Sequence, residues 1–428
     1  MVTGPPSVRW TRTLADPIAG VEAIPGGVLA EGDGRVRALD ATDGSPSWTV
    51  DADRVAAVVD GLVHLVAGRT LVAVDAATGV ERWRYDAPAR FFHERVAVDR
   101  VLLAAGPPDP SFDGTTLVGL DASTGARRWR TRRSGTATAS PGHAGVLVTT
   151  VGGDSDDAVA CLDPADGATR WVRRVDAPVT WASTVPIAAA ARPETTDAGN
   201  ASDDGSSVVL ADLRDGLVAL DGGSGEVRWF VRGRDLTPPV VDPVVGVVAV
   251  GDRGRDRLVA LALETGAVRW SLPDGDVRRL LAVDGAVYAA GWDGTVRALG
   301  GVDGASRWTF DAGAATARLA PFDDLLCLRT DDGRAHAVER DRGRVRWSIG
   351  PDRPTTVVER VGEVLLAVGP DGGADLLSPA TGEAVWRSGA SSYANGPEGL
   401  YLAGDRAVEA LSPDRTRADE GSQADSSS

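Results

Sequence analysis

Arginines at the starts of the expected first strands of several repeats are the residues best suited to bind an anion. They are Arg54, Arg90, Arg278 and Arg318, with Arg353 nearby. A guanidinium group donates two parallel hydrogen bonds to a carboxylate or phosphate, so these arginines are candidates for holding a small anionic or sugar ligand at the mouth of a central channel. The alternative, which we favour, is that they form ion pairs with the abundant aspartates.

Aromatic residues outside the repeating pattern described below form a second set of candidates. Phe92 and His93 are expected on one strand, Trp181 is expected on another, and Trp292 is expected in a turn. Aromatic side chains in such places can anchor a ligand or a protein partner. For Trp181, filling of the core is the favoured alternative.

No group of residues has the spacing of a catalytic or metal centre. The four histidines, His64, His93, His143 and His336, fall in different repeats and form no metal-binding pair. Asp154–Asp157 is rich in oxygen atoms but lacks the glycine and distal glutamate of a dedicated calcium loop. A phosphate-binding glycine loop and a nucleophile elbow are also missing. We therefore predict no catalytic, cofactor-binding or metal-binding residues.

A repeated glycine–tryptophan pair organises the chain. Nine times a glycine follows a short apolar run and a tryptophan stands four positions later, with tryptophans 35 to 58 residues apart. A period near forty with strand-like segments inside it predicts a β-propeller. The tryptophans at the repeat position, which we expect to dock one blade on the next, are Trp48, Trp83, Trp129, Trp171, Trp229, Trp270, Trp308, Trp347 and Trp386.

The seventh repeat shows the expected strands most clearly. Strands are predicted over 277–284, 285–290, 295–299 and 306–310, each closed by glycine or aspartate turn residues. Asp-Gly pairs suit the backbone of tight hairpins, so four antiparallel strands form one blade. The tryptophan falls on the fourth strand, at one height in every blade.

The two ends of the chain are expected to share a blade. A tenth third-strand signature ends near Leu411 without a tryptophan strand after it, and the orphan strand around Trp10 supplies the missing one. Pairing these strands would close the ring and protect a sheet edge. We predict one propeller over residues 1–412 with ten repeats, the alternative being eight blades, and a disordered tail over 413–428.

Insertions mark the surface where recognition is expected. Links between second and third strands are lengthened at 107–114, 152–157 and 252–257, in repeats three, four and six. Loops on a rigid scaffold carry recognition, so this face is the expected binding surface; drift in loop length is the alternative. The longest insertion, 192–207, projects from the opposite face and has a disordered composition.

Composition excludes several kinds of partner. The net charge is −16, and every basic residue apart from histidine is an arginine. A surplus of aspartate fits a salt-rich cytosol or a codon bias, and disfavours nucleic acid and anionic membranes as partners. Because no export signal or apolar span is visible, we expect a cytoplasmic monomer without a membrane span. Cys161 and Cys327 are expected to be buried small hydrophobic residues rather than a disulfide.

The repeat resembles that of the pyrroloquinoline-quinone (PQQ) propeller family. The segments Ala73–Gly79 with Trp83, and Gly119–Gly125 with Trp129, have the family's apolar strand, Asp-x-x-Thr-Gly turn and tryptophan strand. The resemblance covers essentially the whole chain and implies the propeller fold. The family contains quinone-dependent alcohol dehydrogenases as well as non-enzymatic propellers, such as the outer-membrane-assembly scaffold lipoprotein.

Several departures favour the non-enzymatic branch. The dehydrogenases have large insertions and adjacent cysteines at the cofactor, whereas this chain is nearly all repeat and its two cysteines lie far apart. We therefore expect a non-catalytic scaffold that binds a protein through the loop-rich face of repeats three to six, without a cofactor. The alternatives are a PQQ-dependent dehydrogenase with calcium, or a binder of a small anionic or sugar ligand.

Overall fold

The computed structural model describes most of the 428-residue chain. The described residues are 7–87, 93–98, 101–106, 114–142, 145–151, 158–175, 179–186, 207–274, 276–350, 357–361, 364–369 and 373–412. The predicted tail at 413–428 and the insertions at 107–113, 152–157 and 192–206 lie outside them.

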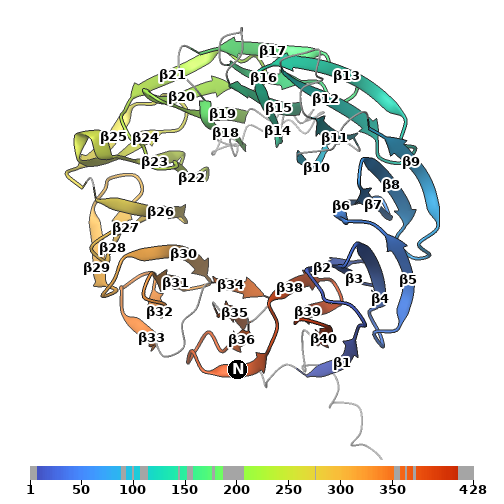
Figure 1. Cartoon of the computed structure of the whole chain (residues 1–428). Helices are drawn as coiled ribbons and strands as arrows, with labels where there is room; N and C mark the ends of the chain where they lie inside the picture. Colours follow the sequence, from blue (N-terminus) through green and yellow to red (C-terminus); the bar gives the residue numbers. More distant parts are fainter. Residues whose placement is uncertain are drawn as a thin grey trace, which may run out of the picture. The chain divides into compact units, whose positions relative to one another are not determined.

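Ten four-stranded antiparallel sheets make up the described chain, and nine of them consist of four consecutive strands (Figure 1). Blades one to three are β2 (Gly20–Ile24), β3 (Gly27–Gly32), β4 (Arg35–Asp40), β5 (Pro46–Asp51); β6 (Arg54–Val59), β7 (Leu62–Ala67), β8 (Thr70–Asp75), β9 (Glu81–Asp86); and β10 (His93–Val98), β11 (Val101–Gly106), β12 (Gly114–Asp121), β13 (Arg127–Ser134). Blades four to six are β14 (Thr136–Gly142), β15 (Gly145–Val151), β16 (Ala158–Leu162), β17 (Thr169–Arg174); β18 (Val179–Pro186), β19 (Ser207–Leu213), β20 (Gly216–Asp221), β21 (Val227–Arg232); and β22 (Val240–Asp242), β23 (Val247–Asp252), β24 (Arg257–Ala262), β25 (Val268–Leu272), with the short 3₁₀ helix η1 (Arg253–Arg255) between β23 and β24. Blades seven to nine are β26 (Val277–Val283), β27 (Ala286–Gly291), β28 (Thr295–Gly300), β29 (Ser306–Asp311); β30 (Thr316–Phe322), β31 (Leu325–Thr330), β32 (Ala335–Glu339), β33 (Val345–Ile349); and β34 (Val357–Val361), β35 (Val364–Val368), β36 (Ala374–Leu377), β37 (Ala384–Ser388).

The tenth blade combines both ends of the chain. It contains β38 (Ser392–Gly396), β39 (Gly399–Ala403) and β40 (Ala407–Leu411), and its fourth strand is β1 (Val8–Thr13). Trp10 lies opposite Ala410 in this antiparallel pair. The predicted pairing of the N-terminal strand with the last three strands is therefore confirmed, as is the count of ten rather than eight blades.

The chain divides into two compact units. Unit 1 comprises Met1–Arg84, Leu325–Val338 and Val345–Ser428, and unit 2 comprises Tyr85–Asp324 and Glu339–Arg344. Unit 1 holds blades one, two, nine and ten, apart from Tyr85 and Asp86 of β9, and unit 2 holds blades three to seven.

Aspartate–glycine turns explain why consecutive strands fold back on each other. In blade seven, Asp284 and Gly285 both have positive φ angles, 51° and 71°, between β26 and β27. Two successive positive φ angles match the right-handed twist of a hairpin, and glycine adopts them without steric cost. The four strands predicted for the seventh repeat are thus confirmed.

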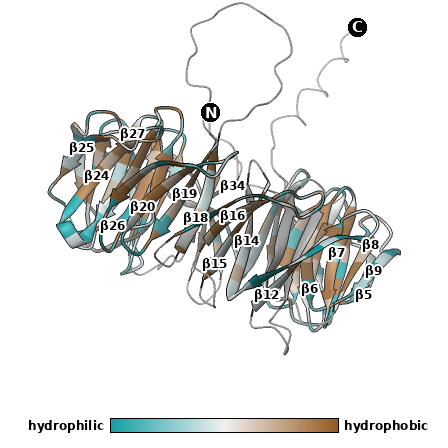
Figure 2. Cartoon of the chain, turned by 90° about the horizontal axis from the view of Figure 1, so that it is seen from above, coloured by the Kyte–Doolittle hydropathy of each residue, from teal (hydrophilic) through white to brown (hydrophobic). Residues whose placement is uncertain are grey.

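The core lies between neighbouring blades and is built from small β-branched and aliphatic residues. Strands β16 and β20 are almost entirely buried, and Figure 2 shows hydrophobic stretches along strands such as β20 and β24. Cys161 and Cys327 are both free and buried, as predicted, and burial raises the pKa of Cys327 to about 12. Over the described residues, no helix has the length and apolar character needed to span a lipid bilayer.

Candidate functional site

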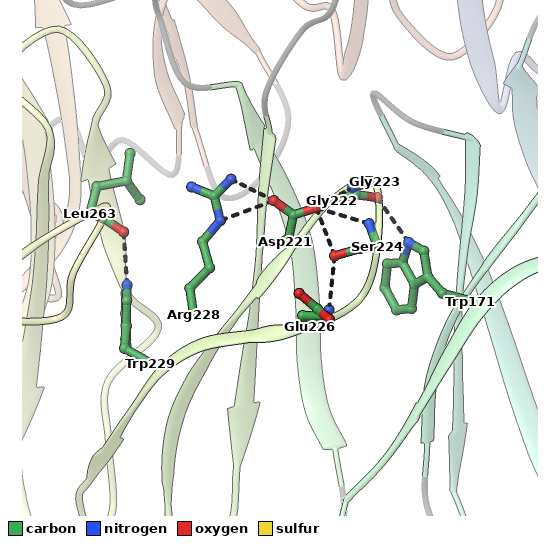
Figure 3. Close-up of polar contacts among 9 residues, drawn as sticks. All are labelled: Trp171, Asp221, Gly222, Gly223, Ser224, Glu226, Arg228, Trp229 and Leu263. Carbon is green, nitrogen blue, oxygen red and sulfur yellow. Dashed lines mark hydrogen bonds and ion pairs between the residues drawn. The ribbon is translucent and has the colours of Figure 1, made fainter.

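The repeat tryptophans join consecutive blades through the same pair of contacts. The indole N–H of Trp171 donates to the carbonyl of Gly222 at 2.9 Å, and that of Trp229 donates to the carbonyl of Leu263 at 2.8 Å (Figure 3). Both accepting residues lie in the turn between the third and fourth strands of the following blade. Each tryptophan thus satisfies its buried N–H on the neighbouring sheet.

In eight of the nine pairs, the glycine lies against the tryptophan of the preceding blade rather than its own; these glycines are Gly44, Gly79, Gly167, Gly225, Gly266, Gly304, Gly343 and Gly382. A Cβ atom on Gly225 would lie 2.5 Å from Trp171, and one on Gly266 would lie 2.6 Å from Trp229. Both glycines also have positive φ angles, 71° and 67°. The turn therefore needs glycine for its backbone and for the space that the indole occupies.

The same hydrogen bond recurs around most of the repeat. Tryptophans whose indole N–H donates to a carbonyl of the next blade's turn are Trp10, Trp48, Trp129, Trp171, Trp229, Trp270, Trp308 and Trp347. Trp83 is also buried, at 8% exposure. Trp386 differs, because it is only half-buried and its indole nitrogen has no hydrogen-bond partner. The following blade ends its third strand at Leu411 and takes its fourth strand from the N-terminus, so the accepting turn is missing there.

An aspartate at the start of this turn pairs with the arginine just before the tryptophan. Asp221 accepts hydrogen bonds from Ser224 and, at 2.6 Å, from Arg228 (Figure 3). The hydrogen bond from Arg228 contributes most to lowering the pKa of Asp221, which falls to about 2. Asp75 and Arg82 form the equivalent pair in blade two. These ion pairs brace the turns and neutralise part of the charge of the arginines.

Two of the candidate residues are brought together by the structure. The guanidinium carbon of Arg278, on β26, lies 4.3 Å from the ring centroid of Trp292, in the turn between β27 and β28. A guanidinium stacked on an indole face is held by the ring's negative electrostatic face. Trp292 remains 52% exposed, so one aromatic surface is available to a partner.

The turn that carries Trp292 is fixed by backbone and side-chain hydrogen bonds. The backbone N–H of Trp292 donates to the carbonyl of Asp276 at 3.1 Å, and the Asp293 carboxylate accepts from the backbone N–H of Thr295 at 2.8 Å. Nearby, Arg297 forms an ion pair with Asp274. Burial raises the pKa of Asp274, Arg297 opposes this, and the charges of Asp293 and Asp276 add to the rise. The aromatic side chain is therefore preorganised on a turn edged by carboxylates.

The insertion of repeat six, 252–257, is built around one buried carboxylate. The Asp252 side chain is 3% exposed and accepts hydrogen bonds from Arg234 N, Arg255 and Arg257 at 3.0 to 3.1 Å. Burial by itself raises the pKa of Asp252, but these donors together lower it below its usual value. An ionised aspartate with three donors thus makes the loop a rigid feature.

This loop adjoins the strand that carries Arg278. The Arg253 guanidinium donates to the carbonyl of Val277 at 3.2 Å. We call the surface formed by the exposed Trp292 and the partly buried Arg253 and Arg278 the blade 6–7 corner. Sequence analysis singled out Arg278, Trp292 and the insertion but missed Arg253 and Asp252; the unusual Asp-Arg-Gly-Arg-Asp-Arg composition of the insertion was the signal available.

The remaining candidates are not brought to this corner by any described contact. Arg318 lies on β30 in a half-buried position, and Arg54 begins β6 in the other compact unit. His93 and Trp181 are placed only by their backbone, opposite Ala105 and Asp212. The remaining two, Arg90 and Phe92, fall outside the described residues, as does Arg353.

The chemistry available at the corner is that of binding. No group of three or more metal-ligating side chains forms among the described residues. An exposed indole, its stacked guanidinium and neighbouring carboxylates supply apolar, cationic and anionic contacts on a fixed backbone. Such a combination is typical of the anchor of a protein interface.

Ten four-stranded blades joined by docking tryptophans define the class of this chain as a β-propeller. The family model described as "Outer membrane protein assembly factor BamB" matches residues 32–185, 155–275, 236–368 and 292–413. The chain therefore belongs to this family of PQQ-like repeat propellers. No curated protein matches it in sequence.

The chain is similar to several solved structures that are distant from it in sequence. BamB from Moraxella catarrhalis is 16% identical, with 95% of this chain and 99% of that chain covered and a TM-score of 0.44. Quinohemoprotein alcohol dehydrogenase ADHIIG from Pseudomonas putida HK5 is 14% identical, with 78% and 72% covered and a TM-score of 0.42. A europium-containing methanol dehydrogenase is 13% identical, with 87% and 85% covered and a TM-score of 0.44.

Proposed function

We propose that this chain is a non-catalytic scaffold that binds a protein partner at the blade 6–7 corner. The observation that carries the proposal is Trp292, half exposed on a hydrogen-bonded turn and stacked on Arg278. A rigid exposed tryptophan is costly to leave in water, and tryptophan and arginine are the side chains most enriched at the energetic centres of interfaces. The family model is described as an assembly factor, which agrees with a scaffold role.

The rigid loop 252–257 extends this surface and refines the expected binding face. Arg253 fixes the loop against the backbone of β26, so Trp292 and the loop can meet one partner without an ordering cost. The insertions of repeats three and four, which we also expect on the partner-binding face, remain part of the proposal as predicted. The proposal centres the interface on repeats six and seven, because the contacts of Arg253 and Arg278 with Val277 and Trp292 support that position.

Photo-crosslinking tests this proposal directly. A photoreactive amino acid in place of Trp292 is expected to crosslink a partner in the cells that make the protein. The matched control replaces Val302, which is 56% exposed in the turn at the other end of the same blade. The proposal predicts one discrete adduct from position 292 and none from position 302.

The crosslinked partner then gives a quantitative prediction. Trp292→Ala should weaken its binding by about 2 kcal/mol, roughly thirtyfold, in a titration with purified components, while Val302→Ala should leave the affinity unchanged. Equal affinities for the two variants, or adducts from both positions, would place the interface elsewhere.

A separate experiment tests the scaffold proposal against the dehydrogenase alternative. Addition of PQQ and calcium to the purified protein should give no stoichiometric change in the quinone absorbance and no alcohol-dependent reduction of a dye. The reason is that the described residues supply no cluster of oxygen ligands for the metal that accompanies the quinone. A saturable spectral change with turnover of alcohol would replace the scaffold proposal with an enzymatic one.

A further inference from the structure

The last strands of blades three and four concentrate positive charge in a chain whose net charge is −16. β13 carries five arginines in eight residues and β17 carries three in six, and neither strand contains a carboxylate. The last strands of the other eight blades contain two arginines at most. The concentration is therefore confined to these two strands.

The two strands are neighbours in space. Arg133 on β13 donates to the hydroxyl of Thr169 on β17 at 3.0 Å, and Trp129 donates to the carbonyl of Pro164 at 2.8 Å (Figure 1 shows the strands side by side). Seven of the eight arginines are exposed. We call them the arginine surface: Arg127, Arg128, Arg130, Arg132, Arg170, Arg173 and Arg174.

Among the described residues, only part of this charge is neutralised. Asp121 pairs with Arg128 at 2.6 Å and Asp163 pairs with Arg170 at 2.9 Å. Arg127, Arg130 and Arg173 make no hydrogen bond or ion pair with the described residues. Within the described part of the chain, these three exposed guanidinium groups are therefore unpaired, and each can bind an external anion.

Beside the arginines, the described residues of β13 and β17 offer an apolar contact but no exposed aromatic ring. Val172, between Trp171 and Arg173, is 56% exposed, whereas Trp129 and Trp171 are 6% and 7% exposed. Single-stranded nucleic acid requires exposed rings for base stacking, and duplex readers place a helix or a ribbon in a groove. Each of β13 and β17 is also the last strand of its sheet, hydrogen-bonded on one side only.

We propose that the arginine surface binds an extended acidic segment of a protein, in which carboxylates alternate with apolar residues. Carboxylates would pair with Arg127, Arg130 and Arg173, and an apolar side chain would cover Val172. This site lies on blades three and four and does not depend on the proposed function at the blade 6–7 corner.

Fluorescence anisotropy with a labelled dodecapeptide of glutamate, aspartate and valine tests this proposal. The wild type should bind the peptide, with an affinity that falls about tenfold or more between low and high salt, because exposed charges are screened. A matched peptide with glutamine and asparagine in place of the acids should not bind. The triple variant Arg127→Gln, Arg130→Gln, Arg173→Gln should bind at least about tenfold more weakly.

Matched controls separate this surface from the net charge and from the other site. The triple variant Arg214→Gln, Arg234→Gln, Arg344→Gln removes three exposed arginines elsewhere and should bind like wild type. Trp292→Ala should also bind like wild type, so failure of one proposal does not affect the other. Tighter binding of a single-stranded DNA dodecamer, or of phosphatidylcholine–phosphatidylserine vesicles, would overturn the proposal. Equal losses in both triple variants, or no peptide binding, would overturn it too.

Discussion

Replacement of Trp229 by alanine should lower the free energy of unfolding by about 3–5 kcal/mol. The indole is 7% exposed, packs against Gly266 and donates its N–H to the carbonyl of Leu263. The substitution would leave a cavity between blades five and six and an unpaired carbonyl in the turn. Urea unfolding followed by circular dichroism gives the loss. Because repeat arrays open locally, hydrogen exchange should show the greatest loss of protection in these two blades.

Trp386 provides the matched comparison for this loss. It occupies the same repeat position, but it is half-buried and its indole nitrogen has no partner. Trp386→Ala should therefore cost clearly less than Trp229→Ala. Equal costs at the two positions would show that contact with the following turn contributes little to docking.

Replacement of Gly266 by alanine should give the second large effect and lower the free energy of unfolding by about 3 kcal/mol or more, because backbone strain and overpacking add. Its φ angle is 67°, which strains any residue with a Cβ, and that Cβ would lie 2.6 Å from the indole of Trp229. Gly34 has almost the same φ angle, 68°, but no atom within 4 Å of the position of its Cβ. Gly34→Ala should consequently cost only the backbone strain, about 1 kcal/mol.

A double-mutant cycle separates the steric clash from the strain. If the indole is what the new methyl group meets, the loss caused by Gly266→Ala should shrink by at least about 1 kcal/mol in the Trp229→Ala background. Additive losses would mean that the glycine is required for its backbone alone.

The architecture was predictable from sequence because its signals are local. Aspartate–glycine turns, apolar strands and a tryptophan at a fixed offset recur in each repeat, so ten blades could be counted without knowledge of long-range contacts. The shared terminal blade followed from the same reasoning, since one strand was left over at the N-terminus and three were left over at the C-terminus. The edge of a strand needs a partner for its backbone groups, so the unpaired N-terminal strand and the incomplete C-terminal blade are expected to pair with each other.

The candidate site was only partly predictable. Arg278 and Trp292 were chosen separately, one for its charge and one for its place outside the repeat, and nothing in the sequence indicated that they stack. The role of Asp252 was also missed by sequence analysis. Its hydrogen-bond donors are the side chains of Arg255 and Arg257 within the loop and the backbone N–H of Arg234, which lies well before it in the sequence. The proximity of side chains on different strands depends on twist and register, which local patterns leave open.

The sequence alone determined the fold class, the number of blades, the shared terminal blade and the positions of the docking tryptophans. Only the tertiary structure decided which residues meet: eight of the nine repeat glycines lie against the indole of the preceding blade, Arg278 stacks on Trp292, and the arginines of β13 and β17 form one surface. The physical reason is that turns and strands are specified by neighbours in the chain. Surfaces and docking contacts are instead made by residues on different strands or different blades, which meet only when the strands pair and the blades pack.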